Sequence, residues 1–425
     1  RGLGDVYKRQ ERGRAEPRWC GMSAALFDLA LRVAARDAGG PVPRLLHNPA
    51  PSRDVKVAVA ARRTGPVVHV QAVGSDGRTH TGTGADGLAA LARAAGCVAG
   101  DLGTGATALV DTPATLRALA GLARSFADPA RCTGLDVAAG SALAGWWAER
   151  AAHPGTSAVT DVLGTSRTRF MLGAAPGDDH AGAWRAALSV PNGVVGLHIW
   201  HQAVTGGPLL PGLDALREDD DWQLQGIQEA VSEHRNWDRP ETLHLAAARL
   251  MSRCDAADLY EAALLADPLW RARGVHTGFV CHGEAVIGAG QAGHRVTVRA
   301  ERLDTRLKAG SAVTGWAGEP MTAMPDAENR FSGEVFATGV SEDGALTVTI
   351  GGLRKTGYRP VAGETVTVIP APPSVSTIRS RRTAVARLYR RRFSWLSQGS
   401  TPTASRRPVP LAVMIAAADD ETPED

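Results

Sequence analysis

Residues 275–370 constrain the fold most, because short β-rich runs there alternate with turns at fairly regular spacing. Two of the runs, 296–299 and 346–350, alternate apolar and polar residues, which is the period of a half-buried strand. Asp343-Gly344 indicates a hairpin, since this pair accepts the positive φ of a tight turn. The expected strands are 275–280, 294–300, 312–316, 331–338, 346–350 and 365–369. Because no helix-length gap separates them, they predict a small antiparallel β-barrel or sandwich.

The composition is that of a chain with one or more ordinary cores. Its 425 residues are enough for two to four domains, and 44% apolar with 21% charged residues excludes global disorder. A formal net charge of +3 gives the whole chain no general attraction to polyanions. Only four of the 47 basic residues are lysine, and alanine and glycine are abundant. This skew indicates a high-GC genome, such as an actinobacterial one.

Cysteine usage and hydropathy bear on the compartment. The five cysteines are scattered and contain no C-x-x-C pair, which argues against a disulfide framework and a thiolate zinc site. No apolar run approaches the roughly 20 residues of a membrane span. We therefore expect a cytoplasmic protein without a transmembrane segment. Residues 1–10, RGLGDVYKRQ, resemble a translated sequencing adapter, so we treat residues 1–21 as a non-native or disordered leader.

Residues 22–165 predict an α/β domain. Thr112 before Pro113 is typical of a helix start, because the hydroxyl suits the N-cap and proline suits the first turn. We expect strands at 55–60, 67–73, 78–83, 106–110 and 135–137, and helices at 24–36, 86–95, 114–126 and 141–151. Residues 75–77, Ser-Asp-Gly, turn the chain into the third of these strands.

The order β-β-β-α-β-α-β-α within residues 53–150 resembles the ribonuclease H-like fold. This resemblance implies that the first three strands form an antiparallel meander and that the fourth, 106–110, is parallel to the first. This resemblance implies a nuclease whose carboxylates hold two metal ions such as Mg²⁺, because the attacking water and the departing oxygen both need charge stabilisation. It also implies a carboxylate on the first strand, whereas run 55–60 has none. The candidate catalytic residues are Asp54, Asp76, Asp111 and Asp136. For Asp111 the alternative is an acid that favours the N-terminus of the next helix.

Residues 166–270 predict a helical connector. Helices are expected at 181–188 and 213–230. Two more should begin near Asp238 and Asp255 and form an antiparallel hairpin that leads into the β module. The stretch 238–241 supports the first of these starts, because it places Asp at the N-cap, Pro just inside the helix and Glu at the third position.

Two clusters offer metal-binding residue types, and each has an alternative interpretation. His198 and His201 could bind a metal if Asp178 or Asp179 came near, but without an H-E-x-x-H pattern they are more typical of packing or interface residues. The acidic run 218–221 could bind a divalent cation, although it lacks EF-hand spacing and suits a solvated turn. We predict no metal site and no other cofactor, with Mg²⁺ required only by a nuclease.

Residues 372–425 form the clearest electrostatic feature, a basic tail with an acidic end. No acid occurs between 365 and 418, and the last seven residues carry five. We expect a disordered tail in which 376–396 can form a basic amphipathic helix. Arginine pairs with phosphate in a planar fork, and aromatic rings stack on bases. The expected nucleic-acid-binding residues are Arg379, Arg381, Arg382, Arg387, Arg390, Arg391, Arg392 and Trp395. An acidic protein partner or an anionic membrane surface suits the same composition.

These observations predict an α/β, ribonuclease H-like domain (22–165), a helical connector (166–270), a small antiparallel β-barrel (271–371) and a basic tail. The β module resembles small barrels of translation factors and helicases, which have many functions. Three hypotheses stay open. The first is a non-catalytic nucleic-acid-binding or accessory protein, for example of an actinobacterial mobile element. The second is a divalent-metal nuclease that uses Asp111 and Asp136 with Asp54 or Asp76. The third is a scaffold whose barrel and tail bind another protein.

Overall fold

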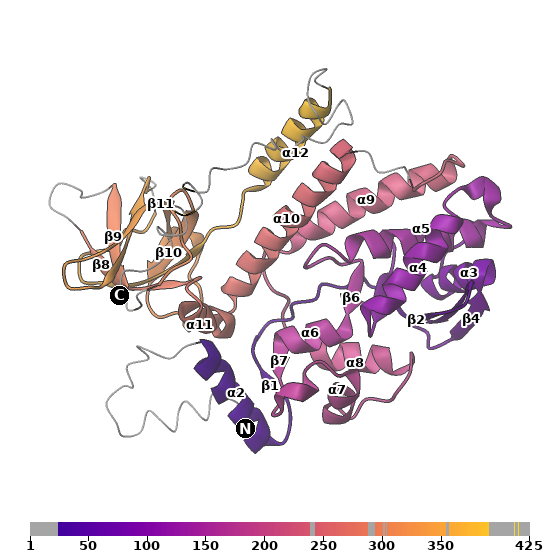
Figure 1. The fold of residues 1–425 in the computed structure, drawn as a ribbon, viewed down its shortest axis with the longest axis horizontal. Coiled ribbons are helices and arrows are strands. Elements are labelled where there is room, and N and C mark those ends of the chain that lie inside the picture. The colour runs from indigo at the N-terminus through magenta and orange to yellow at the C-terminus, as the bar shows by residue number, and fades with distance from the viewer. Residues whose placement is uncertain are drawn as a thin grey trace. The chain divides into compact units, whose positions relative to one another are not determined.

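The computed structural model describes residues 24–390 except 239–242, 288–293, 301, 303 and 354–356, together with residues 412 and 415. This part of the chain is a mixed α/β structure with eleven α-helices and three sheets (Figure 1). It divides into two compact units, Arg1–Arg239 with Ser252–Ile378, and Pro240–Met251 with Arg379–Asp425. Among the described residues, no helix combines the length and the apolar character needed to span a bilayer.

A five-stranded sheet with the order β4-β3-β2-β5-β6 organises the N-terminal part of the first unit. Its strands are β2 (Lys56–Thr64), β3 (Val67–Val73), β4 (Thr79–Thr83), β5 (Thr107–Val110) and β6 (Val159–Asp161). The first three are antiparallel neighbours, and β5 is parallel to β2, with Ala58 beside Leu109. Both the predicted meander and the predicted parallel pairing are confirmed. The fifth strand, β6, pairs parallel with β5 and was not expected from the sequence.

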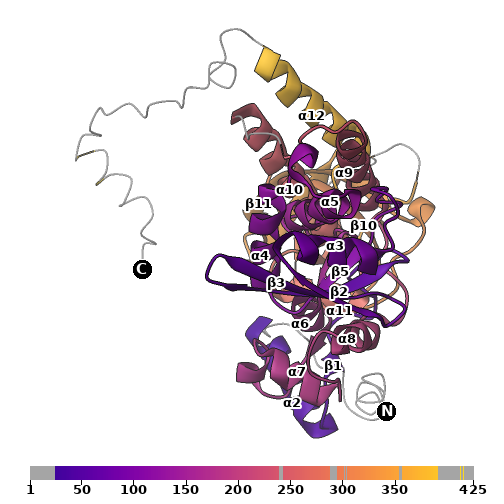
Figure 2. The ribbon, with the colours of Figure 1, turned by 90° about the vertical axis from the view of Figure 1, so that its right-hand side faces the viewer.

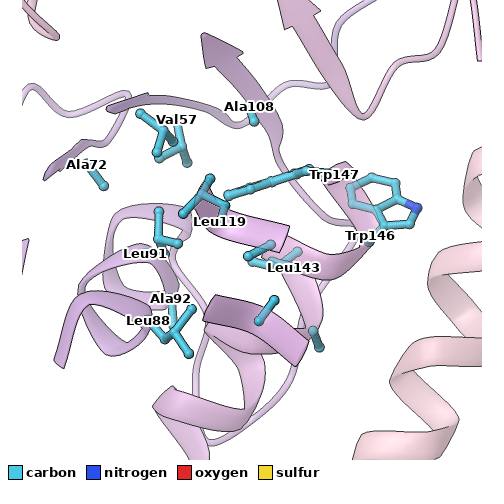
Figure 3. Packing of buried hydrophobic residues seen from close by; sticks show 14 of the residues in the cluster. Val57, Ala72, Leu88, Leu91, Ala92, Ala108, Leu119, Leu143, Trp146 and Trp147 are labelled. Atoms are coloured by element: carbon cyan, nitrogen blue, oxygen red, sulfur yellow. The ribbon is translucent and has the colours of Figure 1, made fainter. Parts of the chain in front are cut away.

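Helices cover both faces of this sheet (Figure 2). On one face lie α3 (Gly84–Ala95), α4 (Pro113–Ser125) and α5 (Leu135–Arg150), and on the other α6 (Val162–Arg169), α7 (Ala181–Ala187) and α8 (Gly196–Thr205). Val57 and Ala108 point towards Leu119 and Trp147 in the first layer (Figure 3). The next residues along each strand, Ala58 and Leu109, point to the other face of the sheet, because side chains alternate along a strand. There they pack in a second core that includes Trp184 and Trp200.

One predicted strand of this domain is wrong. Residues 135–137 are the first turn of α5, whose N-cap is Gly134. The run Leu-Asp-Val is too short for its alternation to distinguish a strand from a helix, and here the helical continuation to Arg150 decides. The predicted start of α4 is right, since Thr112 occupies the N-cap and Pro113 the first turn, although the hydroxyl makes no capping hydrogen bond.

The predicted hairpin of two helices before the β module is also wrong. A single helix, α10 (Leu243–Ala266), runs through Asp255, which is buried within it. The residues around Asp255 are mostly good helix formers, so a single acid does not start a new helix there. The real N-cap is Asp267, whose carboxylate accepts from the backbone N–H groups of Leu269 and Trp270 at the start of α11 (Pro268–His276).

Several further elements complete the first unit. They are α2 (Ala24–Ala38), α9 (Asp214–Ser232), the paired strands β1 (Val42–Pro43) and β7 (Phe170–Met171), and the 3₁₀ helices η1 (Pro129–Arg131), η2 (Ala175–Gly177) and η3 (Ala327–Asn329). The first helix confirms the prediction for 24–36, and α9 confirms that for 213–230. Helices α6 and α8 were missed, because Gly- and Pro-rich neighbours obscure their short apolar patterns.

Six antiparallel strands form the second sheet of the first unit. They are β8 (Cys281–Val286), β9 (Arg295–Ala300), β10 (Ala312–Ala317), β11 (Phe331–Val340), β12 (Leu346–Gly351) and β13 (Thr365–Pro370). The order β10-β11-β12-β9-β8-β13 closes because β13 also pairs with β10, so the predicted antiparallel barrel is present. Val298, Val348 and Val366 fill its interior. The expected strand at 275–280 is wrong, because those residues end α11 and turn the chain.

The basic helix expected within the tail is present over most of its predicted length. Residues Val375–Arg390 form helix α12. Ser374 supports its start, because the Ser374 Oγ accepts a hydrogen bond from the Thr377 backbone N–H at 3.1 Å. Beyond Arg390, the predicted tail lies outside the described residues, apart from residues 412 and 415.

Candidate functional site

The four predicted catalytic carboxylates do not meet. Asp54 is exposed and precedes β2, and Asp76 is exposed in the β3–β4 turn, where its carboxylate accepts from the Arg78 N–H at 3.0 Å. Since β3 is antiparallel to β2, Asp54 and Asp76 both lie at the end of the sheet where β2 begins. Asp111 follows the end of β5, at the opposite edge, and Asp136 lies in the first turn of α5. Within the described ranges, no group of three His, Cys, Asp or Glu side chains could hold a metal ion.

The first strand offers no acid next to Asp111. Ala58 is the register partner of Leu109, so two residues further along, Ala60 stands level with Asp111. The residues of β2 that face the end of β5 are therefore alanines and valines. A metal that needs carboxylates from both strands does not fit this donor set.

The structure instead brings Asp111 next to Asp161, a residue that the sequence interpretation missed. Asp161 ends β6, pairs with Val110 in the sheet and caps α6 by accepting from the Gly164 N–H at 3.2 Å. Burial raises the pKa of Asp161, backbone hydrogen bonds to the carboxylate lower it, and the charge of Asp111 raises it further. An acid directly after the short apolar run 158–160 was the only signal of this site in the sequence.

A cavity of about 270 Å³ opens beside these strand ends, and we call it the strand-end cavity. It lies outside the carboxyl ends of the parallel strands β5 and β6, the usual position of ligand sites in α/β sheets. Its polar lining includes His153, Thr156, Thr160, Asp161, Thr165 and Thr168. Prolines, aliphatic side chains and Tyr260 of α10 supply most of the other surface.

Two side chains of this lining are buried without a hydrogen-bond partner. His153 is only 1% exposed, and among the described residues neither of its ring nitrogens makes a hydrogen bond of ordinary geometry, although the Glu149 backbone lies close enough to act on the ring. The Glu149 Oε1 lies 4.0 Å from Nε2. Burial, followed by the charge of Arg150, lowers the pKa of His153 to about 4, so the ring is neutral at pH 7. The Thr160 hydroxyl is also buried and unpaired. Unsatisfied buried polar groups are rare in proteins and require an explanation.

A buried ion-pair network holds the loop that carries His153. The Arg150 Nε donates to Asp220 at 2.5 Å, and the Ser157 N–H and hydroxyl donate to the same carboxylate at 2.7 and 2.9 Å. Thr156 adds a further hydrogen bond, and Arg150 also pairs with Asp219 at 3.0 Å. The acidic run 218–221 therefore contributes two buried residues of α9 to this network, which neither of its sequence interpretations anticipated.

The two histidines of α8 are not joined by a carboxylate. His198 Nε2 lies 3.1 Å from the carbonyl of Val73, and His201 is buried. Burial lowers the pKa of His201 to about 4, with smaller effects of Lys56 and His198. The expected acidic partners are engaged elsewhere, Asp178 with Arg32 and Asp179 with Arg167. The packing interpretation fits this arrangement.

The outer face of the closed sheet carries an exposed aromatic ring. Phe336 lies in an irregularity of β11, between Val335 and Ala337, and is 57% exposed. The Arg295 guanidinium lies over the ring, 3.9 Å from its centroid. Gly351, the register partner of Arg295, has no side chain to cover the pair. We call these three residues the Phe336 surface; nothing in the sequence pattern had identified it.

The predicted nucleic-acid-binding residues belong to the C-terminal part of the chain. Arg379 and Arg381 are exposed on α12, and Arg382, Arg387 and Arg390 belong to the same helix. Arg391, Arg392 and Trp395 lie outside the described residues.

The chain matches no protein-family model, no curated protein and no solved structure. Its function therefore has to be inferred from its own surfaces. These are the strand-end carboxylates and cavity, the Phe336 surface, and the basic helix α12.

Proposed function

We propose that this chain is a non-catalytic nucleic-acid-binding protein built on a ribonuclease H-like domain. The sheet supports the domain assignment, because an antiparallel meander whose first strand pairs parallel with the fourth is what the resemblance implies. The positions of the acidic residues support a protein that does not cleave nucleic acid, because these residues could not hold a metal ion together. Ala60 lies beside Asp111, and Asp54 and Asp76 lie at the opposite end of the strands.

The Phe336 surface gives the main support for nucleic-acid binding. Aromatic rings on exposed sheet faces bind single strands by stacking on bases, and this tolerates any sequence because every base has a π-face. The Arg295 guanidinium adds a positive charge at the same place, where it can stack or meet a phosphate. Phe336 is 57% exposed and lies outside the buried cluster of the closed sheet, so packing in that core does not explain its position.

The arginines of α12 supply a second, sequence-independent contribution. Arg379, Arg382 and Arg390 recur at the spacing of one helix face. Contacts to phosphate position a protein on a strand without reading its bases. The Phe336 surface would then bind bases, while α12 binds the backbone.

Fluorescence anisotropy tests this proposal with the purified full chain, freed of nucleic acid, and labelled single-stranded DNA and RNA of roughly 20 nucleotides. Phe336→Ala should weaken binding by about 1–3 kcal/mol, the cost of one lost stacking contact. It should barely change binding to heparin, which has no bases. Val340→Ala is the matched control, because Val340 is a 70% exposed apolar residue of the same strand. Equal losses on heparin and DNA, or no binding at all, would rule the proposal out and favour a protein-docking scaffold.

One observation favours the nuclease as a second candidate. Asp111 and Asp161 are neighbours at the carboxyl edge of the sheet, and paired acids are typical of hydrolytic sites. Incubating the chain with labelled DNA and RNA in Mg²⁺ or Mn²⁺ separates the two functions. Cleavage that disappears in both Asp111→Asn and Asp161→Asn would establish the nuclease, whereas intact substrate would support the non-catalytic function.

A further inference from the structure

We propose that the outward side of helix α9 binds an arginine-rich segment of a partner protein, and that the side chain of Trp222 is the central contact. We call this side of the helix the α9 surface. Its residues are Asp214, Glu218, Trp222, Gln225 and Glu229. None of them belongs to the Phe336 surface or to α12, so the inference does not depend on the chain binding nucleic acid.

The α9 surface follows from the spacing of its residues. They recur every three or four positions, so their side chains line one side of the helix. All five are exposed. On the opposite side of α9, Leu216, Leu224 and Val231 are buried in two hydrophobic cores. The helix is therefore held in place by its inner side, and its packing does not need the α9 surface.

Trp222 is the most exposed aromatic side chain among the described residues, at 67%. Four other tryptophan rings have an arginine guanidinium over them, between 4.8 and 5.5 Å from the ring centroid; they are Trp146, Trp200, Trp270 and Trp316. No arginine or lysine of the described chain lies over Trp222. The face of an indole ring attracts cations, and tryptophan and arginine are among the residues that contribute most to protein–protein binding. The ring of Trp222 is therefore available to a cation from a partner.

Three acids of the α9 surface can pair with such a cation. Glu218 lies one turn before Trp222, Glu229 two turns after it, and Asp214 one turn before Glu218. Within the described residues these three carboxylates form no ion pair. The buried ion pairs and the pair with Arg53 use other acids of α9, namely Asp219, Asp220 and Asp221.

These charges favour arginine over other ligands. A guanidinium that stacks on the indole ring can also meet a neighbouring carboxylate in a planar fork, which the ammonium of lysine cannot do. The same acids would repel phosphate, so a nucleic-acid strand and an anionic membrane surface do not fit. Electrostatic complementarity of this kind steers the encounter of two proteins and fixes their register.

The length of the α9 surface sets the size of the bound segment. From Glu218 to Glu229 the helix rises roughly 16 Å, at about 1.5 Å per residue. An extended segment covers this distance with about five residues. A second copy of the chain cannot pair through the same surface, because the acids of the two copies would face one another. The segment is therefore short, extended and rich in arginine.

Isothermal calorimetry with the purified full chain tests the inference. The probe is a peptide of alternating arginine and serine, about eight residues long, which is enough to span the α9 surface. The same peptide with citrulline in place of arginine is the matched ligand control, because citrulline keeps the shape of the side chain but has no charge. The arginine peptide should bind at least about tenfold more tightly than the citrulline peptide, as expected for a cation that meets both a ring and a carboxylate.

Substitutions on α9 separate the contributions of the ring and of the acids. Trp222→Ala should weaken binding of the arginine peptide by about tenfold, and Trp222→Leu by nearly as much, because leucine offers apolar area but no π face. Glu218→Gln should weaken it by about two- to fivefold and make it less sensitive to salt. Since both side chains are exposed, the circular dichroism spectrum of each variant should match that of the wild type.

Phe336→Ala and Glu284→Gln are the matched control variants, since they remove an exposed ring and an exposed acid from the closed sheet. Both should bind the arginine peptide as the wild type does, and Trp222→Ala should retain single-stranded DNA binding. The inference is wrong if the arginine peptide does not bind at millimolar concentration, if the citrulline peptide binds equally well, or if Trp222→Ala binds the arginine peptide like the wild type. Sedimentation velocity tests the other occupant: self-association that is lost in Trp222→Ala would assign the α9 surface to a second copy of the chain and overturn the inference. None of these results would bear on the Phe336 surface.

Discussion

Arg150 and Asp220 form an ion pair that is sealed from solvent, with Nε 2.5 Å from Oδ1 and both residues 0% exposed. The pair joins α5 to α9 across 70 positions of the sequence. Burying two charges is costly unless hydrogen bonds satisfy their remaining atoms, and Thr156 and Ser157 do this for the carboxylate. The loop that follows α5 is thereby tied to α9.

Replacing Asp220 with Leu should destabilise the chain by about 3–5 kcal/mol, because it leaves Arg150 charged and buried, with Asp219 at 3.0 Å and Glu149 at 3.9 Å as its remaining acidic partners. Urea unfolding followed by circular dichroism measures this loss. Glu233→Gln removes an acid from the exposed pair with Arg235 and should change the free energy of unfolding by less than about 1 kcal/mol. Similar effects of the two substitutions would show that the buried network is not needed for stability.

Two helical glycines should respond in opposite directions to alanine. A Cβ on Gly140 of α5 would lie 1.9 Å from the carbonyl oxygen of Leu88, so Gly140→Ala must force α3 and α5 apart. We expect a loss of at least about 1–3 kcal/mol, as for other overpacked cores. Gly121 of α4 has nothing within 4 Å, and Gly121→Ala should stabilise by roughly 0.5–1 kcal/mol through helix propensity. Thermal unfolding of both variants checks the contrast, and a stable Gly140→Ala protein would contradict the close approach.

Stability should fall as the pH drops from about 6.5 to about 4. His153 and His201 have pKa values of about 4 in the folded chain, below the 6.5 of an unburied histidine, so the unfolded chain takes up the protons first. The contribution of the two neutral histidines to the free energy of unfolding is complete above pH 6.5. It is lost as the pH falls from 6.5 to about 4. At about 1.4 kcal/mol per pKa unit, each residue accounts for up to about 3 kcal/mol.

Urea midpoints measured across this window for the wild type and for His153→Phe isolate one of the two contributions. The variant should show a shallower fall in stability with decreasing pH, because it lacks one proton-binding group. His69→Gln, on the exposed face of β3, is the control and should leave the pH dependence close to that of the wild type. Parallel curves for wild type and His153→Phe would contradict the prediction.

The tail should bind polyanions through charge alone. Changing Arg390, Arg391 and Arg392 to Ala should weaken binding to all single-stranded sequences alike, because phosphate contacts carry no base information. The slope of log affinity against log salt should become shallower by about 0.7 for each lost contact. Anisotropy titrations at several salt concentrations measure the slope, with Arg235→Ala as an exposed control outside α12. An unchanged slope would show that these arginines do not meet phosphate.

Local patterns were sufficient to predict much of the fold. The positions of β2, β3, β4 and β5 followed from strand-like runs and their turns, whereas the parallel pairing of β5 with β2 was an implication of the resemblance to the ribonuclease H-like fold. Five of the six strands of the closed sheet followed from short β-rich runs and the turns between them, and two of those runs also alternate apolar and polar residues. The start of α4 followed from Thr112-Pro113. These features depend on residues that are close in the chain, so a window of the sequence contains the forces that set them.

The sites depend on residues that are distant in the chain. No window of sequence shows that Asp220 meets Arg150, that Asp161 comes next to Asp111, or that His153 and Thr160 share one cavity. The run 135–137 became helix rather than strand because its packing against α3 and α4 outweighs a weak local preference. The sequence by itself determined most of the helices and strands that have an apolar face, although α8 was missed. Only the tertiary structure decided which polar groups are buried, because desolvation and pairing arise where separate segments meet.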